Sequence, residues 1–155
     1  IIVWYHRVEW GWSNLAPNGW NSQLNDDIRN GRSKAASLSD VRWALEAYVS
    51  SVGGIPKGYG VMDTIWPNAS TIYDRVNSNI PVIIGSDTMP DPTGGDKMAH
   101  AVVVHKVDRT AKKNWIGITE YKDYHYWAHF GWGTGYNNVM LTHASFKIDS
   151  RCNFQ

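Results

Sequence analysis

The stretch AHAVVVHKV, residues 99–107, joins a histidine to a run of β-branched apolar residues and decides how the chain folds. Three successive valines are typical of a strand that is buried in a sheet. His100 stands at the start of this strand, directly after the segment TMPDPTGGDKM at 88–98, whose Pro and Gly content predicts a loop. Because a strand is rigid, a side chain at its first residues can be held at the edge of a cleft. The stretch therefore predicts a sheet strand that presents a histidine for chemistry.

Apolar segments on both sides of residues 99–107 predict the other strands. Residues 80–87 read IPVIIGSD, and residues 115–121 read WIGITEY after a predicted turn at RTAKKN, residues 109–114. The segments HYWAHFGW and YNNVMLT continue the series. Short connections join antiparallel strands, so we expect an antiparallel sheet.

Two helices are predicted before these strands. Residues 37–54 give the clearest helix, because Ser37 and Asp40 form a start similar to a capping box and apolar residues recur at helical spacing. Residues 66–79 predict a second helix, with Asn68 as its N-cap. Both helices precede the main run of strands.

The N-terminal part of the chain completes the predicted architecture. Residues 1–10 resemble the middle of a buried helix, because no capping residue precedes their apolar start, and a short helix is predicted to end near Gly31. Helices followed by strands predict an α+β fold in which N-terminal helices pack on an antiparallel β-sheet. With 155 residues and no internal repeat, we expect a single domain, 1–155.

Composition argues against several classes of partner. The net charge is +1 and no basic stripe is present, so nucleic acid is not an expected partner. No apolar run approaches the about 20 residues of a membrane span, and the first ten residues lack the features of a signal peptide.

The one cysteine, Cys152, excludes an intrachain disulfide and is expected to be a mobile tail thiol rather than a nucleophile. Nine Trp and eight Tyr are expected mainly to fill the core.

The histidines are the candidates for chemistry. Histidine is the usual general base at neutral pH, which favours His100, and a structural or surface histidine is the alternative. His105 lies five positions on and is expected on the opposite face of the strand. His125 and His129 would share a strand face, and a zinc site with His100 is a further alternative. Nothing fixes that spacing, so neither a metal nor a cofactor is predicted.

The segment HFGWGTGYNNVML, residues 129–141, alternates aromatic residues with glycines. Glycines permit a tight bend and a close approach of the backbone. The aromatic rings would then form a lid over a neighbouring histidine. The alternative is a bulged hairpin that packs its rings on the core.

Together these motifs resemble the papain-like cysteine peptidases of bacteria, in particular the streptopain and C39-like peptidase branches. In those families a GHA-V-V-GY strand carries the catalytic histidine, and a later H-NWGWGG segment forms the wall beside it. IPVIIGSD is similar to their -PVI-G strand, and LSDVRWALEAYVSSVGG is similar to their preceding helix. The resemblance spans most of residues 38–142.

The resemblance implies a thiol-dependent hydrolase that cleaves amide bonds in a peptide or protein substrate. His100 would be the general base, Trp132 would shield its ring, and His129 or Asp123 would hold the second ring nitrogen. The nucleophilic cysteine of these families begins an N-terminal helix, which places it upstream of Ile1 here, on a processed segment or on a separate Cys-bearing peptide. The same resemblance implies a secreted or cell-surface bacterial protein.

The sequence departs from this family pattern at two positions, and two other interpretations stay open. Ala99 stands where Gly is common, and His129 stands where Asn is frequent. One alternative is a catalytically inactive papain-like domain that binds peptide or cell-wall carbohydrate through its aromatic side chains. The other is an unrelated aromatic-rich carbohydrate-binding or interaction domain, with fewer helices and more strands.

Overall fold

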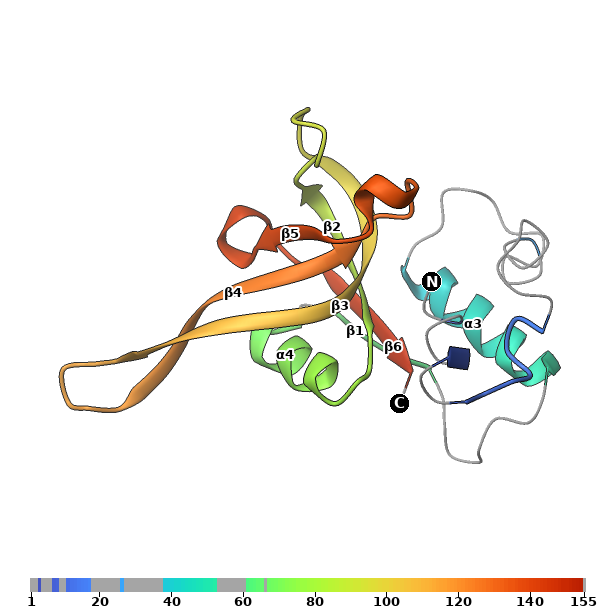
Figure 1. Ribbon diagram of the computed structural model, residues 1–155, viewed down its shortest axis with the longest axis horizontal. Helices are drawn as coiled ribbons and strands as arrows, with labels where there is room; N and C mark the ends of the chain where they lie inside the picture. The colour runs from blue at the N-terminus through green and yellow to red at the C-terminus, as the bar shows by residue number, and fades with distance from the viewer. Residues whose placement is uncertain are drawn as a thin grey trace.

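The fold combines helices with one antiparallel sheet, which confirms the predicted α+β class (Figure 1). The computed structural model describes residues 3, 7–8, 11–17, 26, 38–52, 61–65 and 67–154. The helices described from end to end are α3 (Leu38–Val52) and α4 (Ala69–Asn77), together with two short 3-10 turns, η1 (Thr134–Tyr136) and η2 (His143–Ser145). The strands are β1 (Val61–Ile65), β2 (Val82–Met89), β3 (Met98–Lys113), β4 (Thr119–His129), β5 (Val139–Thr142) and β6 (Ser150–Phe154).

The order of strands in the sheet is β1-β6-β2-β3-β4-β5, and every neighbouring pair is antiparallel. This corrects the expectation that the helices precede all strands, because β1 comes before α4. The prediction of a mobile tail around Cys152 is also wrong. Cys152 lies within β6, where it is the register partner of Asp63 on one side and Ile83 on the other.

The boundary between β3 and β4 differs from the predicted one. RTAKKN, expected as a turn, belongs largely to β3, which pairs with β4 as far as Lys113 and Thr119. The chain reverses at residues 114–118 instead. Asn114 holds this reversal because its side-chain oxygen accepts hydrogen bonds from the N–H groups of Ile116 and Ile118, at 3.1 and 2.9 Å. An asparagine that bonds its own backbone is a stronger turn signal than the polar run before it.

Two hydrophobic clusters cover the two faces of the central strands. Successive side chains of a strand point to opposite faces, so a strand that is buried on both faces is apolar throughout. Ile84, Val102 and Val104 join the cluster on the α4 side, whereas Ile83 and Val103 join the cluster on the α3 side. The continuous apolar runs of β2 and β3 follow from this burial on both faces.

The expectation that tryptophans fill the core is wrong for the described residues. No Trp in this part of the chain is among the buried hydrophobic side chains, whereas Tyr48 and Tyr126 are. Trp43, Trp115 and Trp132 are instead exposed. A large indole ring is seldom fully enclosed in a small core, so other apolar residues fill it here.

Helix α4 begins as predicted at Asn68. The Asn68 side-chain oxygen accepts a hydrogen bond from the Thr71 N–H at 2.8 Å, and Ile72 and Val76 then face the core. Helix α3 is tied to the N-terminal segment, because the Ala16 N–H donates to the Tyr48 hydroxyl at 3.0 Å.

The remaining helix predictions fall mostly outside the described residues. For the predicted helix at 1–10, Val3, Arg7 and Val8 are described and are helical. For the predicted short helix before Gly31, Asp26 is described and is helical. None of the described helices combines the length and the apolar character that a membrane span requires.

The contribution of the Asn68 cap to the stability of the protein can be tested directly. Asn68→Ala leaves the Thr71 N–H without its side-chain acceptor, and we expect a loss of about 1 kcal/mol in the free energy of unfolding. Urea denaturation measures this loss. Asn68→Asp keeps the acceptor oxygen and is expected to remain close to the parent protein. Equal losses in the two variants would contradict the role of the cap.

Candidate functional site

His100 is placed at the edge of the sheet by the pairing of β3 with β2. It is the third residue of β3, lies opposite Ser86 of β2 and is half-buried. The loop before it is held by Asp91, whose side-chain oxygen accepts a hydrogen bond from the Thr93 N–H at 2.7 Å. The backbone of His100 is therefore fixed, although a loop precedes it.

Aromatic rings surround the His100 imidazole. Phe130 stacks on it, with ring centroids 5.5 Å apart, and Trp132 lies 5.0 Å away at 48°. Phe130 and Trp132 contact each other edge-on, and Tyr136 continues the series against Trp132 at 5.7 Å. We call His100, Phe130, Trp132 and Tyr136 the His100 cluster. The predicted juxtaposition of Trp132 and His100 is therefore present.

A main-chain carbonyl orients the His100 ring. The Nε2 atom of His100 lies 3.1 Å from the carbonyl oxygen of Phe130. A carbonyl oxygen only accepts hydrogen bonds, so Nε2 carries the proton and donates it. In the neutral ring the other nitrogen, Nδ1, then keeps its lone pair and can accept a proton.

The glycines after β4 bring Phe130 and Trp132 to His100. Gly131 and Gly133 have φ values of +81° and +103°, which residues with a Cβ rarely adopt. The Phe130 N–H donates to the Tyr136 carbonyl at 3.0 Å and closes the bend. The expected tight turn in HFGWGTGYNNVML is therefore present, and it returns the chain to β5.

His129 does not contact His100. It is the register partner of Val103, so it lies on the α3 face of the sheet, whereas His100 alternates with Val102 and Val104 on the other face. Its Nδ1 accepts a hydrogen bond from the Gly131 N–H at 2.9 Å. Burial, together with the charge of nearby His105, lowers the pKa of His129. His129 thus stabilises the glycine bend rather than the His100 ring.

Asp123 is also remote from His100. It lies on β4 between the residues that pair with Asp108 and Thr110 of β3. Asp108 is eight residues along β3 from His100, roughly 26 Å at the usual rise of a strand. The orienting role that the resemblance gave to His129 or Asp123 is filled here by the Phe130 carbonyl.

The described histidines do not form a metal site with His100. His105 is exposed, and its Nε2 lies 3.1 Å from the carbonyl oxygen of Asn137. Among the described residues, no three His, Cys, Asp or Glu side chains come together in a way that could hold a metal ion.

A second cluster forms around His143, which sequence reasoning passed over. Tyr126 is fully buried, and its hydroxyl lies 2.9 Å from Nδ1 of His143. Burial raises the pKa of Tyr126, so the phenol keeps its proton at neutral pH and remains a hydrogen-bonding partner of the His143 ring. Burial also lowers the pKa of His143. No spacing in the sequence signals a contact between residues 17 positions apart, because it depends on the pairing of β4 with β5.

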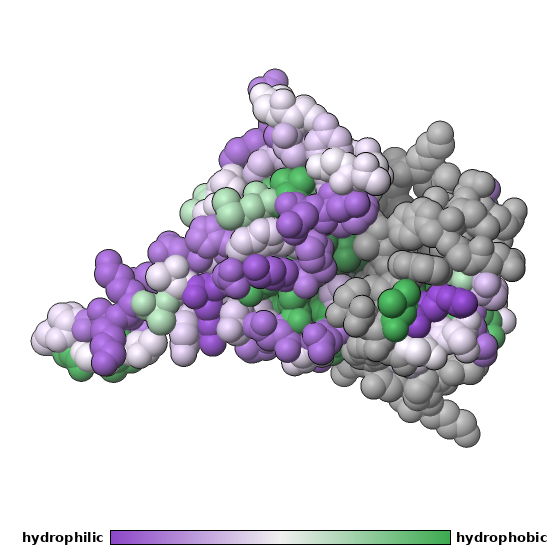
Figure 2. All heavy atoms as spheres, in the orientation of Figure 1, coloured by the Kyte–Doolittle hydropathy of each residue, from purple (hydrophilic) through white to green (hydrophobic). Residues whose placement is uncertain are grey.

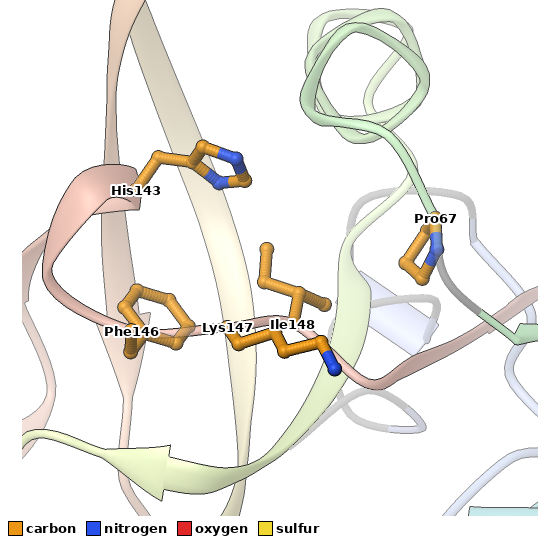
Figure 3. Close-up of a pocket in the computed structure, with 5 residues that line it drawn as sticks. All are labelled: Pro67, His143, Phe146, Lys147 and Ile148. Carbon is orange, nitrogen blue, oxygen red and sulfur yellow. The ribbon is translucent and has the colours of Figure 1, made fainter.

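His143 lines a pocket of about 290 Å³. Figure 3 shows its ring above Phe146 and Ile148, with Pro67 on the far side. Lys147 lies at the rim, where its ammonium group is 3.9 Å from a carboxylate oxygen of Asp149. Three apolar side chains, Pro67, Phe146 and Ile148, and two polar ones, His143 and Lys147, therefore line the pocket.

Comparison of the sequence with protein-family models and with curated proteins gives no match.

The lowered pKa of His143 predicts how stability depends on pH. The unfolded chain binds a proton at His143 below a pKa of about 6.5, whereas the folded state resists protonation, so stability falls as the pH falls from that value toward the folded pKa. His129 contributes with the same sign. Urea denaturation between neutral and mildly acidic pH measures the slope, and His143→Gln should reduce it. An unchanged slope in that variant would refute the assignment.

Proposed function

We propose that this chain is the histidine-bearing part of a papain-like, thiol-dependent amide hydrolase that acts on peptide or protein substrates. His100 is the general base of this reaction. The observation that carries the proposal is the state of its ring: Nε2–H is bonded to the Phe130 carbonyl at 3.1 Å, and Trp132 lies against the ring. Nδ1 is thereby left as the proton acceptor.

The His100 cluster has the parts that activation of a thiol requires. Nδ1 takes the thiol proton, which creates a thiolate and an imidazolium. The Phe130 carbonyl then accepts a charge-assisted hydrogen bond from the cationic ring. Phe130 and Trp132 cover the ring from water, and the lower local dielectric strengthens the ion pair.

The proposed reaction proceeds in two stages. The thiolate attacks the carbonyl carbon of the amide, and the C–N bond breaks as His100 returns its proton to the leaving amine. A water molecule then attacks the acyl-enzyme, with His100 taking its proton, and releases the acid and the free thiol. Each step uses Nδ1 alone, so the carbonyl of Phe130 holds the ring throughout.

Cys152 is not the nucleophile in this proposal. Its backbone pairs with Ile83, three residues along β2 from the partner of His100, and β2 lies between the strands of Cys152 and His100. Strand spacing and rise put the two Cα atoms roughly 14 Å apart. In the resembled families the nucleophile is a cysteine at the start of an N-terminal helix, and the proposal adopts that assignment.

The alternative is a non-catalytic papain-like domain that binds peptide or cell-wall carbohydrate. The observation that favours it is the exposure of Trp132, whose ring is 40% exposed and adjoins Tyr136. Exposed aromatic rings can stack on sugars or on peptide side chains. In that case His100→Ala would leave ligand affinity unchanged.

Thiol labelling of the full-length gene product tests the catalytic proposal. Iodoacetamide at pH 6 should alkylate a cysteine other than Cys152, because the ion pair keeps that thiol ionised. In His100→Ala the pKa of the thiol returns toward about 8.5, so we expect at least ~10-fold slower labelling and loss of peptide hydrolysis. Mass spectrometry of the labelled peptides measures both the site and the rate.

Two control variants make this experiment specific. His105→Ala removes an exposed histidine from the same strand, and Cys152→Ser removes the thiol in β6. Both should label as the parent protein does. Labelling confined to Cys152, or a rate that His100→Ala leaves unchanged, would overturn the proposal.

A further inference from the structure

Strands β3 and β4 extend beyond the rest of the sheet as a two-stranded arm. The arm comprises residues 108–125, and its pairs run from Asp108 and His125 to Lys113 and Thr119. The pairing of β2 with β3 ends at Val104, and β5 pairs with β4 only from His125 onward. Figure 1 shows the arm projecting far from the helices and the other strands.

The arm ends in exposed apolar side chains. We call residues 114–118, with the sequence NWIGI, the tip. The Trp115 side chain is 95% exposed, and Ile116 and Ile118 are each more than half exposed. Figure 2 shows apolar surface at the end of the arm, next to hydrophilic surface. Three large apolar side chains on one projecting turn are more than the scattered exposure normal for a soluble protein.

Most N–H groups of the tip find hydrogen-bond acceptors within the tip itself. The N–H groups of Ile116 and Ile118 donate to the Asn114 side chain, the Gly117 N–H donates to the Asn114 carbonyl, and the Asn114 N–H donates to the Ile118 carbonyl. Entry into an apolar medium is costly for peptide groups that lack a partner. The tip avoids most of that cost because four of its five N–H groups are already bonded.

Positive charge lies directly behind the tip. Lys112 and Lys113 are exposed, and no ion pair among the described residues involves either one. Glu120, the register partner of Lys112, is held by the Lys122 ammonium at 2.8 Å and by the Asn114 amide at 3.2 Å. The end of the arm therefore presents two uncompensated cations beside its apolar residues.

The base of the arm is fixed to helix α4. The Arg109 guanidinium lies over the ring of Tyr73 at 3.8 Å and over the ring of Tyr121 at 3.6 Å. Tyr73 belongs to α4, and its ring also contacts Tyr124 edge-on. Cation–π contacts of this kind hold the arm in one direction.

We propose that the arm is a membrane-contact element whose tip enters the interface of an anionic bilayer. Trp115 lies at the headgroup level with Ile116 and Ile118 below it, and Lys112 and Lys113 contact the lipid phosphates and carboxylates. A projecting tip whose N–H groups are mostly bonded can enter the bilayer interface at modest cost, and the cations next to it complement anionic headgroups. The inference does not depend on the hydrolase function proposed above.

Sedimentation with lipid vesicles tests the proposal. The parent protein should bind vesicles of phosphatidylcholine with phosphatidylserine more tightly than vesicles of phosphatidylcholine alone, and added salt should weaken the binding. Trp115→Ser should lower the partition coefficient at least ~10-fold. The double variant Lys112→Gln/Lys113→Gln should lower it about 10- to 30-fold on the anionic vesicles only.

Trp43→Ser is the matched control. Trp43 is 56% exposed on α3, outside the arm, and its replacement should leave binding unchanged. Brominated lipids should quench the fluorescence of the parent protein more than that of Trp115→Phe. No binding to anionic vesicles, or equal binding by Trp115→Ser, would overturn the proposal. Self-association that Trp115→Ser abolishes without lipid would also overturn it and assign the tip to a protein contact.

Discussion

The burial of β2 and β3 on both faces is the constraint on which the rest of the structure depends. Ile84, Val102 and Val104 face the α4 side, and Ile83 and Val103 face the α3 side. A shift of one residue in the register would move each side chain to the opposite face, where it would have to pack in the other hydrophobic cluster. Both cores therefore select the same register, and that register places His100 opposite Ser86.

The same alternation explains why the site differs from the one that the resemblance implied. His100 and His129 lie on neighbouring strands but on opposite faces, so their rings cannot meet. The Phe130 carbonyl lies in the backbone and does not depend on which face a side chain occupies. It can therefore bond the His100 ring where the side chain of His129 cannot. A main-chain acceptor also constrains residue 130 less than a side-chain acceptor would.

Local sequence patterns correctly predicted the features that depend on interactions within one short segment. The valine strand and the Asn68 cap follow from burial and capping within short segments. The contact of Trp132 with His100 joins segments that are brought together by the pairing of β3 with β4, and it was expected for this tryptophan only from the resemblance. Pairings between distant segments were not predictable. The insertion of β6 between β1 and β2, and the contact of Tyr126 with His143, depend on how the whole sheet closes. The position of the turn between β3 and β4 was also mispredicted, although its signal is local. Asn114 marks the turn, whereas the prediction placed it at the polar residues before Asn114.

The stability of the fold does not explain why large tryptophan side chains stand exposed at positions 115 and 132. The two clusters of the described chain hold no tryptophan among their buried members, which are aliphatic residues, methionine, phenylalanines and tyrosines. Trp132 lies against the His100 ring, and Trp115 stands at the end of an arm beside which none of the described strands pairs as a third strand. A two-stranded arm gains little stability from its own pairing. Its length, its closed tip and its clamp at Arg109 are therefore better explained by contact with another surface than by the stability of the fold.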